Sequence, residues 1–490
     1  MIVIFLAVSS YYFSSLSVTE IKVDNIKRTQ FALKQAKQAL IAYAATYNDI
    51  KFSGEHGILP CPDYNNGVLA EGLEDNGNCG ARGISKLGYL PWRTLRIQPL
   101  KDESGTCLMY AVTGEYKNDE SATPTFKSLM LNEDSYGTFD IVREDSSIVT
   151  GGNPADRIVA LVFAPGRPLP YQARTFTNGT LCGGEYAKFE QYLDTVGAID
   201  NSSLTGNVAD IDEFVHATSA SELQYNDLFL TITREEIWQS ILNRNDFEQK
   251  MENLSHAMAM CLATYANQTD NSSRRLPWPA TTNLSGADYP EQNSYQDDNG
   301  ATEGYSGRYP YNVSNSNNEI DPDPMSMTAD ELLNACDSVV ISIPDPPGSL
   351  TVNLTATAPD MEYRELWNNW KDHFFYVLSS RYEPKNVASS SEVECGGSGE
   401  CITVNGTEYA AAVIFSGRRL DSQSRNDKSL VSDYLEDGKA DEFIEEAKVI
   451  NRKGNRAYTY TDPQTESIND IMYCIEDKPV NDVLSVIECS

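Results

Sequence analysis

The strongest constraint on this chain of 490 residues is an internal repeat. Six short segments of the first half return in the same order in the second half. The matching pairs are Ala39–Tyr47 and Ala257–Tyr265, Ile58–Asp63 and Arg275–Ala280, Gly88–Trp92 and Gly307–Tyr311, Leu161–Gly166 and Ala412–Gly417, Tyr192–Asp194 and Tyr434–Glu436, and Asn226–Asp227 and Asn469–Asp470. Gln172 and Arg174 are likewise echoed by Gln423 and Arg425. Each match is weak alone, but the shared order indicates a tandem duplication of one unit of roughly 200 residues, the size of a domain.

The charge balance limits the partners that the chain can have. It carries 71 acidic and 38 basic residues, which gives a formal net charge of −33. Such a surface repels phosphate backbones and anionic lipid headgroups, so nucleic acid is not expected as a partner. An acidic surface also keeps a protein soluble in salty surroundings, and that interpretation requires no particular partner.

The ten cysteines favour disulfide bonds and an oxidising, extracytoplasmic compartment. Cys61 and Cys79 flank a loop rich in Asn, Gly, Glu and Asp, and Cys395 and Cys401 bracket a short glycine-rich loop. We expect these two pairs to be bonded. Zinc is the alternative, but it requires closely spaced Cys or Cys/His ligands, and the chain shows no such spacing.

The N-terminus predicts a membrane-anchoring segment over residues 1–22. Met1–Val18 carries no charged side chain, and the first acidic residue is Glu20. The apolar stretch continues without Gly or Pro into a helical pattern that ends near Tyr47, as an anchor would. A secretory leader is the alternative, but a basic start and a small-residue cleavage site are missing. The lack of Lys or Arg before the segment suggests that further residues precede Met1.

The repeat divides the rest of the chain into residues 23–240 and 241–490. Thr233–Glu236 reads as a capping box that starts a helix near the end of repeat 1. Repeat 2 carries an insertion around residues 312–366, followed by an aromatic stretch that includes Trp367 and Trp370. These two tryptophans are candidates for a partner-binding surface, and the alternative is that they fill the core of repeat 2.

One loop has the composition of a calcium site. Asp63, Asn65 and Asp75 lie within or beside the Cys61–Cys79 loop and offer the oxygen ligands that calcium prefers. The spacing of a complete calcium loop is missing, so a solvated acidic loop is the alternative. No catalytic motif is found, and none of the four histidines belongs to one. We therefore expect no enzymatic activity and no cofactor apart from this calcium.

Several segments together resemble the large pilin-like proteins of bacterial type IV pilus and type II secretion systems. They are Gln35–Tyr43, Leu59–Asp63, Gly88–Leu95, Phe163–Gly166, Gln172–Arg174 and Asn226–Glu236. The resemblance covers most of residues 20–240 and extends to 246–480 only through the internal repeat. It implies an α+β fold: an N-terminal hydrophobic helix followed by two tandem pilin-like domains, each a helix packed on a small antiparallel sheet, with disulfides.

The resemblance also implies a function, although the chain departs from the usual pilin pattern in two ways. Met1–Val18 contains neither the Gly nor the Glu with which pilin chains usually begin, and the duplication makes the protein bulky. Both point to a minor or tip subunit, or to a membrane-anchored relative that never enters a filament. The leading expectation is a non-enzymatic pilin or pseudopilin that acts in filament assembly. Its implied partners are other pilin-like subunits, the inner-membrane assembly machinery and the membrane, with the domains facing the periplasm or carried outside in a filament. The alternative is a membrane-anchored or tip-located adhesin that binds a glycan or protein through repeat 2. A periplasmic enzyme has no motif in its favour.

Overall fold

The structure is a computed structural model, and it divides the chain into two compact units. Unit 1 comprises Met1–Ile50, His56–Leu131 and Ser135–Ile241, and unit 2 comprises Lys51–Glu55, Asn132–Asp134 and Leu242–Ser490. The residues that the structure describes are 2–490 except 65–69, 118–129, 176–178, 183–187, 208–209, 219–223, 269–270, 272–273, 287, 298–304, 314–331, 333–335, 337, 344–347, 356–360, 385–394, 396–400, 437–438, 440–456, 459, 461–468, 479–482 and 490.

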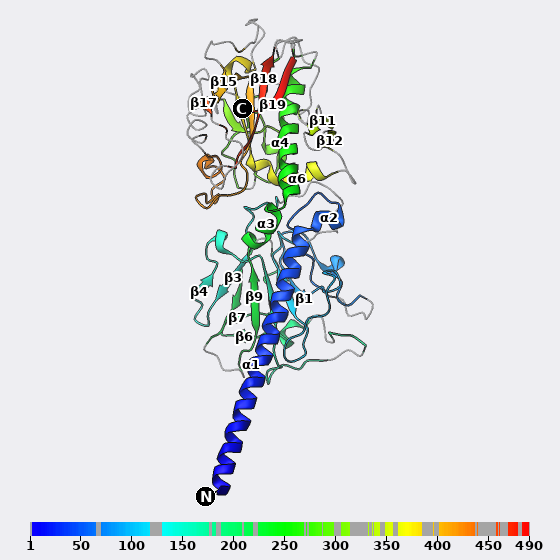
Figure 1. Ribbon diagram of the computed structural model, residues 1–490, viewed down its shortest axis with the longest axis vertical. Helices are drawn as coiled ribbons and strands as arrows, with labels where there is room; N and C mark the ends of the chain where they lie inside the picture. The colour runs from blue at the N-terminus through cyan, green and yellow to red at the C-terminus, as the bar shows by residue number, and fades with distance from the viewer. Residues whose placement is uncertain are drawn as a thin grey trace. The chain divides into compact units, whose positions relative to one another are not determined.

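Unit 1 is built on the helix α1 (Ile2–Ala45). Its second half buries an apolar stripe at helical spacing, formed by Leu33, Ala36, Leu40 and Ala44. This stripe packs against two strands of a sheet, and Figure 1 shows that the first half of α1 extends beyond that sheet. The helix therefore has a half that the unit covers and a half that the unit leaves uncovered.

The main sheet of unit 1 has four antiparallel strands in the order β1-β2-β5-β9. They are β1 (Lys86–Tyr89), β2 (Met109–Val112), β5 (Ala160–Ala164) and β9 (Leu228–Ile232). A second sheet contains β4 (Ile148–Thr150), β3 (Phe139–Val142) and β8 (Asp212–Val215), and a hairpin contains β6 (Thr195–Val196) and β7 (Ile199–Asp200). Every residue of β5 is buried because the strand is apolar throughout and lies inside the sheet.

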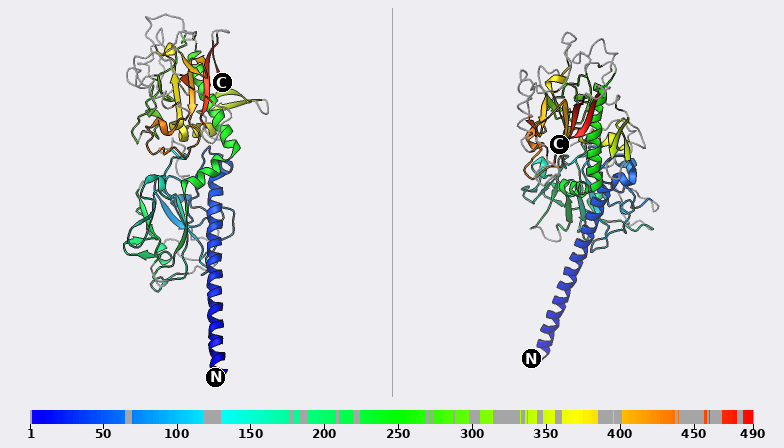
Figure 2. Two further views of the ribbon diagram at one scale, coloured as in Figure 1. Left: turned by 60° about the vertical axis from the view of Figure 1, so that its left-hand side comes forward. Right: turned by 45° about the horizontal axis from the view of Figure 1, so that its top comes forward.

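Unit 2 has its own helix and five-stranded sheet. The helix α4 (Asn245–Ala266) packs against the sheet β10-β13-β16-β18-β19, all of whose pairs are antiparallel, and Figure 2 shows it beside β18 and β19 from two sides. The strands are β10 (Ser306–Arg308), β13 (Phe374–Leu378), β16 (Ala411–Phe415), β18 (Ile471–Lys478) and β19 (Val483–Glu488). Smaller sheets contain β11 (Ser338–Ile343) and β12 (Gly348–Asn353), and β15 (Thr407–Tyr409), β14 (Ile402–Val404) and β17 (Ala457–Tyr458).

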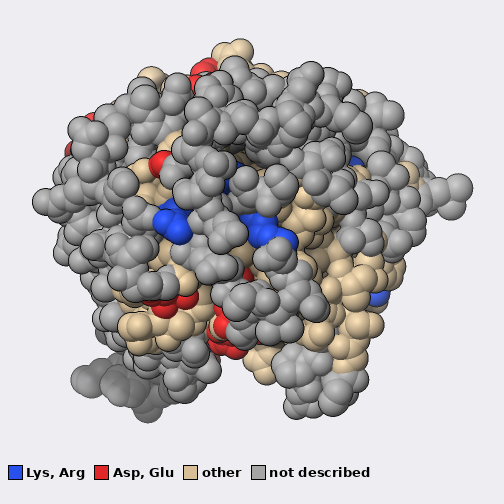
Figure 3. All heavy atoms as spheres, turned by 90° about the horizontal axis from the view of Figure 1, so that it is seen from above, with Lys and Arg blue, Asp and Glu red and all other residues tan. Residues whose placement is uncertain are grey.

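Short helices connect these elements. The α-helices are α2 (Tyr47–Lys51), α3 (Arg234–Leu242) and α6 (Glu362–Trp370), and the 3₁₀ turns are Asn76–Asn78, Pro154–Asp156, Phe189–Gln191, Gln292–Ser294, Lys371–His373, Ser380–Tyr382 and Val431–Asp433. The predicted capping box is confirmed at the start of α3, because the Thr233 N–H donates to Glu236 Oε2 at 3.0 Å and the Glu236 N–H donates to Thr233 Oγ1 at 3.3 Å. On the face shown in Figure 3, the described residues present small separate groups of acidic and basic side chains.

The α+β fold expected from the sequence is wrong. The described part of the chain is a mixed α/β structure with several small sheets, not a helix on one small antiparallel sheet in each domain. Parallel pairs occur in two of the sheets, between β3 and β8 and between β14 and β17. These pairs join segments that lie far apart in the sequence, such as Phe139 with Asp212, so no local pattern could have indicated them.

The expected hydrophobic anchor at the N-terminus is also corrected. Across the described residues, no helix combines the length and the apolar character needed to cross a membrane. The sequence gives the reason, since Ser9–Ser17 contains five serines and Glu20 follows soon after.

All ten cysteines are paired in disulfides. The bonds are Cys61–Cys79, Cys107–Cys182, Cys261–Cys336, Cys395–Cys401 and Cys474–Cys489. Each bond lies within one unit. Cys61–Cys79 and Cys395–Cys401 are the two pairs expected from the sequence.

Removal of the Cys107–Cys182 bond is expected to destabilise unit 1 strongly. The bond closes a loop with a sequence separation of 75, and the loss of its constraint on the unfolded chain is worth about 4 kcal/mol. Urea unfolding of a variant with both cysteines changed to alanine measures this loss. The same change at Cys395 and Cys401, with a separation of 6, should cost only about 2 kcal/mol and act on unit 2. Equal losses for the two pairs would contradict the chain-entropy explanation.

Candidate functional site

A hydrogen-bonded brace in unit 1 is built from the repeated Gln and Arg. Gln172 Oε1 accepts from the Leu169 N–H at 2.9 Å, and its Nε2 donates to Asp194 Oδ1 at 3.0 Å. Arg174 donates to Gln172 Oε1 at 3.0 Å and to the Gly166 carbonyl at 2.7 Å. The two side chains thus tie the turn after β5 to a loop some twenty residues further along the chain.

The same brace occurs in unit 2. Gln423 Oε1 accepts from the Leu420 N–H at 3.0 Å, and its Nε2 donates to Glu436 Oε1 at 2.8 Å. Arg425 donates to Gln423 Oε1 at 3.1 Å and to the Gly417 carbonyl at 3.3 Å. Residues that match in the sequence therefore make matching hydrogen bonds in the two units.

Each brace ends on a pair of acids, of which Asp194, Asp227 and Asp470 are buried and Glu436 is half-buried. In unit 1 the Asp194 N–H donates to Asp227 Oδ2 at 2.8 Å, and in unit 2 the Glu436 N–H donates to Asp470 Oδ2 at 3.1 Å. Burial, and then the charge of Asp194, raises the pKa of Asp227 well above its ordinary value. In unit 2 the Lys439 ammonium lies 3.2 Å from Asp470 Oδ2 and supplies a positive charge.

The two braces differ in the side chain that accepts a further hydrogen bond from the arginine. In unit 1, Arg174 Nη1 donates to Thr106 Oγ1 at 3.1 Å. In unit 2, Arg425 Nη1 instead donates at 2.7 Å to Glu133, which also accepts from the Arg419 N–H at 2.5 Å. Glu133 belongs to Asn132–Asp134, a tripeptide of repeat 1 in sequence that is part of unit 2 in the structure. Unit 2 therefore incorporates an acidic segment from the other repeat.

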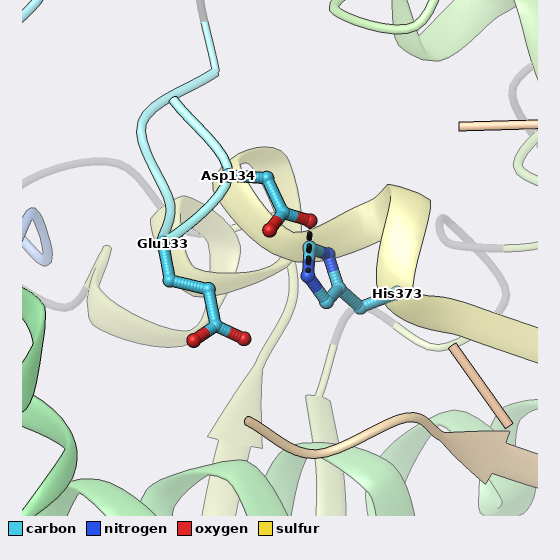
Figure 4. Close-up of side chains that lie close together, drawn as sticks. All are labelled: Glu133, Asp134 and His373. Carbon is cyan, nitrogen blue, oxygen red and sulfur yellow. Dashed lines mark ion pairs between the residues drawn. The ribbon is translucent and has the colours of Figure 1, made fainter. Parts of the chain in front are cut away.

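Asp134, the next residue of this tripeptide, is paired with a buried histidine. His373 Nε2 lies 3.1 Å from Asp134 Oδ2, and its Nδ1 lies 2.8 Å from Asp372 Oδ1. Lys428 pairs with the other oxygen of Asp372. Figure 4 shows the Asp134 carboxylate facing the His373 ring, with the Glu133 carboxylate to one side. The imidazole is thus held between two carboxylates.

The electrostatics favour the charged form of His373. Burial disfavours the imidazolium, but the charges and hydrogen bonds of Asp372 and Asp134 outweigh burial and raise the pKa of His373. Burial would likewise raise the pKa of Asp372, yet Lys428 and His373 hold it well below its ordinary value. For Arg425 the nearby carboxylates outweigh burial and raise its pKa. The cluster is therefore a network of paired charges.

The same cluster contains side chains of the kinds that bind metal ions. Glu133, Asp134 and His373 are buried and offer ligand atoms within 4.8 Å of one another, the one group of this kind found among the described residues. One imidazole and two carboxylates suit zinc in kind. However, Arg425 already pairs with Glu133 and Lys428 with Asp372, and the flanking carboxylates of Asp134 and Asp372 favour the charged form of His373. A divalent ion would add positive charge beside Arg425, so the residues fit a closed ion network better than a metal centre.

Metal removal provides a test of this assignment. If the cluster is an ion network, prolonged treatment with EDTA should leave the melting temperature of unit 2 unchanged. Added zinc at a ratio of one ion per chain should also have no effect. A rise of several degrees with zinc, reversed by EDTA, would contradict the assignment, because a ligand that binds the folded state stabilises it by mass action.

The acids predicted to bind calcium have other roles. Asp63 Oδ2 accepts from the Gly72 N–H at 2.6 Å, and Asp75 Oδ2 accepts from Asn78 Nδ2 at 2.7 Å. These carboxylates close turns of the loop, and neither belongs to a metal-ligand group among the described residues. Asn65 lies outside the described residues. Calcium binding at these three positions stays a prediction.

The predicted partner-surface residues lie in the core of unit 2. Trp367 is 0% exposed and Trp370 is 1% exposed. The ring of Trp367 lies 5.4 Å from that of Tyr309, and the ring of Trp370 lies 5.7 Å from that of Phe247. The two tryptophans are therefore packing residues, which was the alternative interpretation. Most of the insertion at 312–366 lies outside the described residues.

No sequence pattern indicated the contacts of Glu133 and Asp134. His373 belongs to no motif, and Arg425 stands out only as a repeated residue. One signal was present: Arg425 is retained in both copies, although its acidic partner comes from outside the repeat pattern.

Comparisons with family models, with curated proteins and with solved structures find no match for the chain.

Proposed function

We propose that the chain is a non-enzymatic structural subunit of an extracytoplasmic filament, of the type IV pilus or type II secretion kind. The observation that carries the proposal is the division of α1 into a covered and an uncovered half. The helix has 44 residues, about 66 Å of length, and the sheet of unit 1 covers its second half only. Half of the helix is thus left for other molecules.

Apolar side chains that suit helix packing are exposed near the middle of α1. Val23 and Ile26 are 45% and 44% exposed, and three-residue spacing puts them on one side of the helix. Phe31, further along, is 70% exposed. Equivalent helices of other pilin-like subunits would cover these groups. The disulfides support a location facing the periplasm or outside the cell, where the inner-membrane assembly machinery would deliver the subunit.

A charge placed on the uncovered part of α1 tests the proposal. Val23→Asp should abolish recovery of the chain in filaments sheared from the cells that produce it, because it would bury a carboxylate between helices. Val149→Asp is the matched control, since Val149 on β4 is 43% exposed and belongs to the same unit. Equal recovery of the two folded variants, or absence of the unaltered chain from sheared filaments, would refute the filament role.

The two tryptophans expected to form a binding surface do not support the adhesin alternative. Trp367 and Trp370 are buried in unit 2 and cannot contact a glycan or a partner protein without unfolding. We therefore keep the filament subunit as the proposed function.

A further inference from the structure

Unit 2 contains a cavity of about 410 Å³. Its apolar side is formed by Phe247 and Met251 of α4, by Trp370 of α6 and by Phe415 of β16. Gly417, Arg418 and three asparagines add polar groups to the lining. A cavity of this size with an apolar wall and a few polar groups is typical of sites for small ligands.

The corresponding place in unit 1 is filled by a turn of the chain itself. By the repeat, Thr29 corresponds to Phe247 and Gly166 corresponds to Gly417. Thr29 Oγ1 accepts from the Glu103 N–H at 2.9 Å, and the Gly166 N–H donates to Asp102 Oδ2 at 2.8 Å. The turn that begins at Asp102 therefore covers α1 and places a carboxylate on the Gly166 amide.

The backbone around the two glycines is the same. Gly166 and Gly417 have φ values of +66° and +59°. The carbonyl of the next residue accepts from an asparagine side chain at 2.8 Å in both units, from Asn226 in unit 1 and from Asn469 in unit 2. The Gly417 N–H is thus held as the Gly166 N–H is, but no described residue accepts from it.

We propose that the cavity of unit 2 binds a single carboxylate attached to an apolar body. The carboxylate accepts from the Gly417 N–H, as Asp102 does from Gly166, and is attracted by Arg418, whose side chain is exposed. Thr29 and Ala164 of unit 1 are replaced in unit 2 by Phe247 and Phe415, so the wall has become aromatic.

The same lining sets the charge of the ligand. Glu248 also lies at the cavity and repels a second carboxylate, so monoanions are preferred. The C-terminus of a peptide that ends in an apolar residue has this chemistry, and so does a free aromatic acid.

Calorimetric titration of the full chain tests the proposal with N-acetyl-phenylalanine as the probe. We expect a dissociation constant of about 1 mM, as is usual for a ligand of this size. N-acetyl-phenylalanine amide, which lacks the charge, should bind at least tenfold more weakly. Equal binding of the acid and the amide, or no binding of the acid at millimolar concentration, would overturn the proposal. Titration with 3-phenylpropionate distinguishes a site for peptide C-termini from a site for free aromatic acids. A site for peptide C-termini prefers the N-acetylated probe, and a site for free acids does not.

Two variants locate the site. Arg418→Glu should weaken binding of the acid at least tenfold, whereas Arg167→Glu, the matched change in unit 1, should have no effect because Asp102 occupies that place. Asn245→Trp, at the exposed start of α4, should block the cavity without disturbing the core. Undiminished binding by both Arg418→Glu and Asn245→Trp would show that the probe binds elsewhere.

Discussion

Replacement of Glu133 by alanine is expected to lower the free energy of unfolding of unit 2 by about 3–5 kcal/mol. Arg425 is 1% exposed, and Glu133 is its carboxylate partner at 2.7 Å. The change leaves a guanidinium buried without that partner, which is more costly than the simple loss of a contact. Urea unfolding followed by a probe in unit 2 measures the effect.

A double-mutant cycle isolates the interaction. The variant that carries both Glu133→Ala and Arg425→Ala should lose less stability than the sum of the two single losses, because neither charge is then left alone. Asp421→Ala, at an exposed position in the same unit, should change stability by no more than about 0.5 kcal/mol. Additive losses at Glu133 and Arg425 would mean that the ion pair contributes nothing.

Glu436→Gln is expected to stabilise unit 2 in alkaline solution and to change little near pH 4. Burial, and then the charge of Asp470, raises the pKa of Glu436 to about 8. The folded state therefore binds this proton more tightly than the unfolded state, whose glutamate has a pKa near 4.3. The resulting stability is fully present below that value and is lost as the pH rises through about 8. Because the side chain is partly exposed, screening limits the gain to about 1–2 kcal/mol.

Melting temperatures of the two forms between pH 4 and pH 9 provide the measurement. The unaltered chain should lose stability in unit 2 between about pH 4.5 and pH 8, and the Gln variant should lose less. His373 acts in the same direction, since its raised pKa gives stability below about pH 6.5 that is lost as the pH rises through the folded value. Glu248→Gln, at an exposed position on α4, is the control. If the melting temperatures of the original chain and of Glu436→Gln fall in parallel as the pH rises, the Glu436–Asp470 pair is not the cause of the loss of stability.

The sequence was informative wherever a residue recurs in both copies. Gln172 and Gln423, and with them Arg174 and Arg425, proved to make matching hydrogen bonds to matching loops. A repeated polar residue has to satisfy the same backbone groups in each copy, so its recurrence carries structural information. The capping box at Thr233 could be predicted for a related reason, since both of its partners lie within one turn.

The contacts between distant segments could not be predicted. Glu133 and Arg425 are 292 positions apart, and only one copy of the repeat makes this contact. The role of Asp63 within its own loop could not be predicted either, because composition does not reveal that its carboxylate accepts from the Gly72 N–H. The anchor prediction relied on the absence of charge, which is not the same as sufficient apolar character.

The place of Asn132–Asp134 in unit 2 has a consequence for the history of the chain. Immediately after a duplication, each copy can fold by its own means. Once Arg425 and His373 depend on Glu133 and Asp134, a gene that encodes only residues 242–490 yields a core in which Arg425 lacks Glu133 and His373 keeps only one of its two carboxylate partners, Asp372. Loss of the first copy is then expected to destabilise the second, whatever the two copies contribute to function. Such a contact would favour retention of repeat 1 beside repeat 2 even as the two sequences diverge.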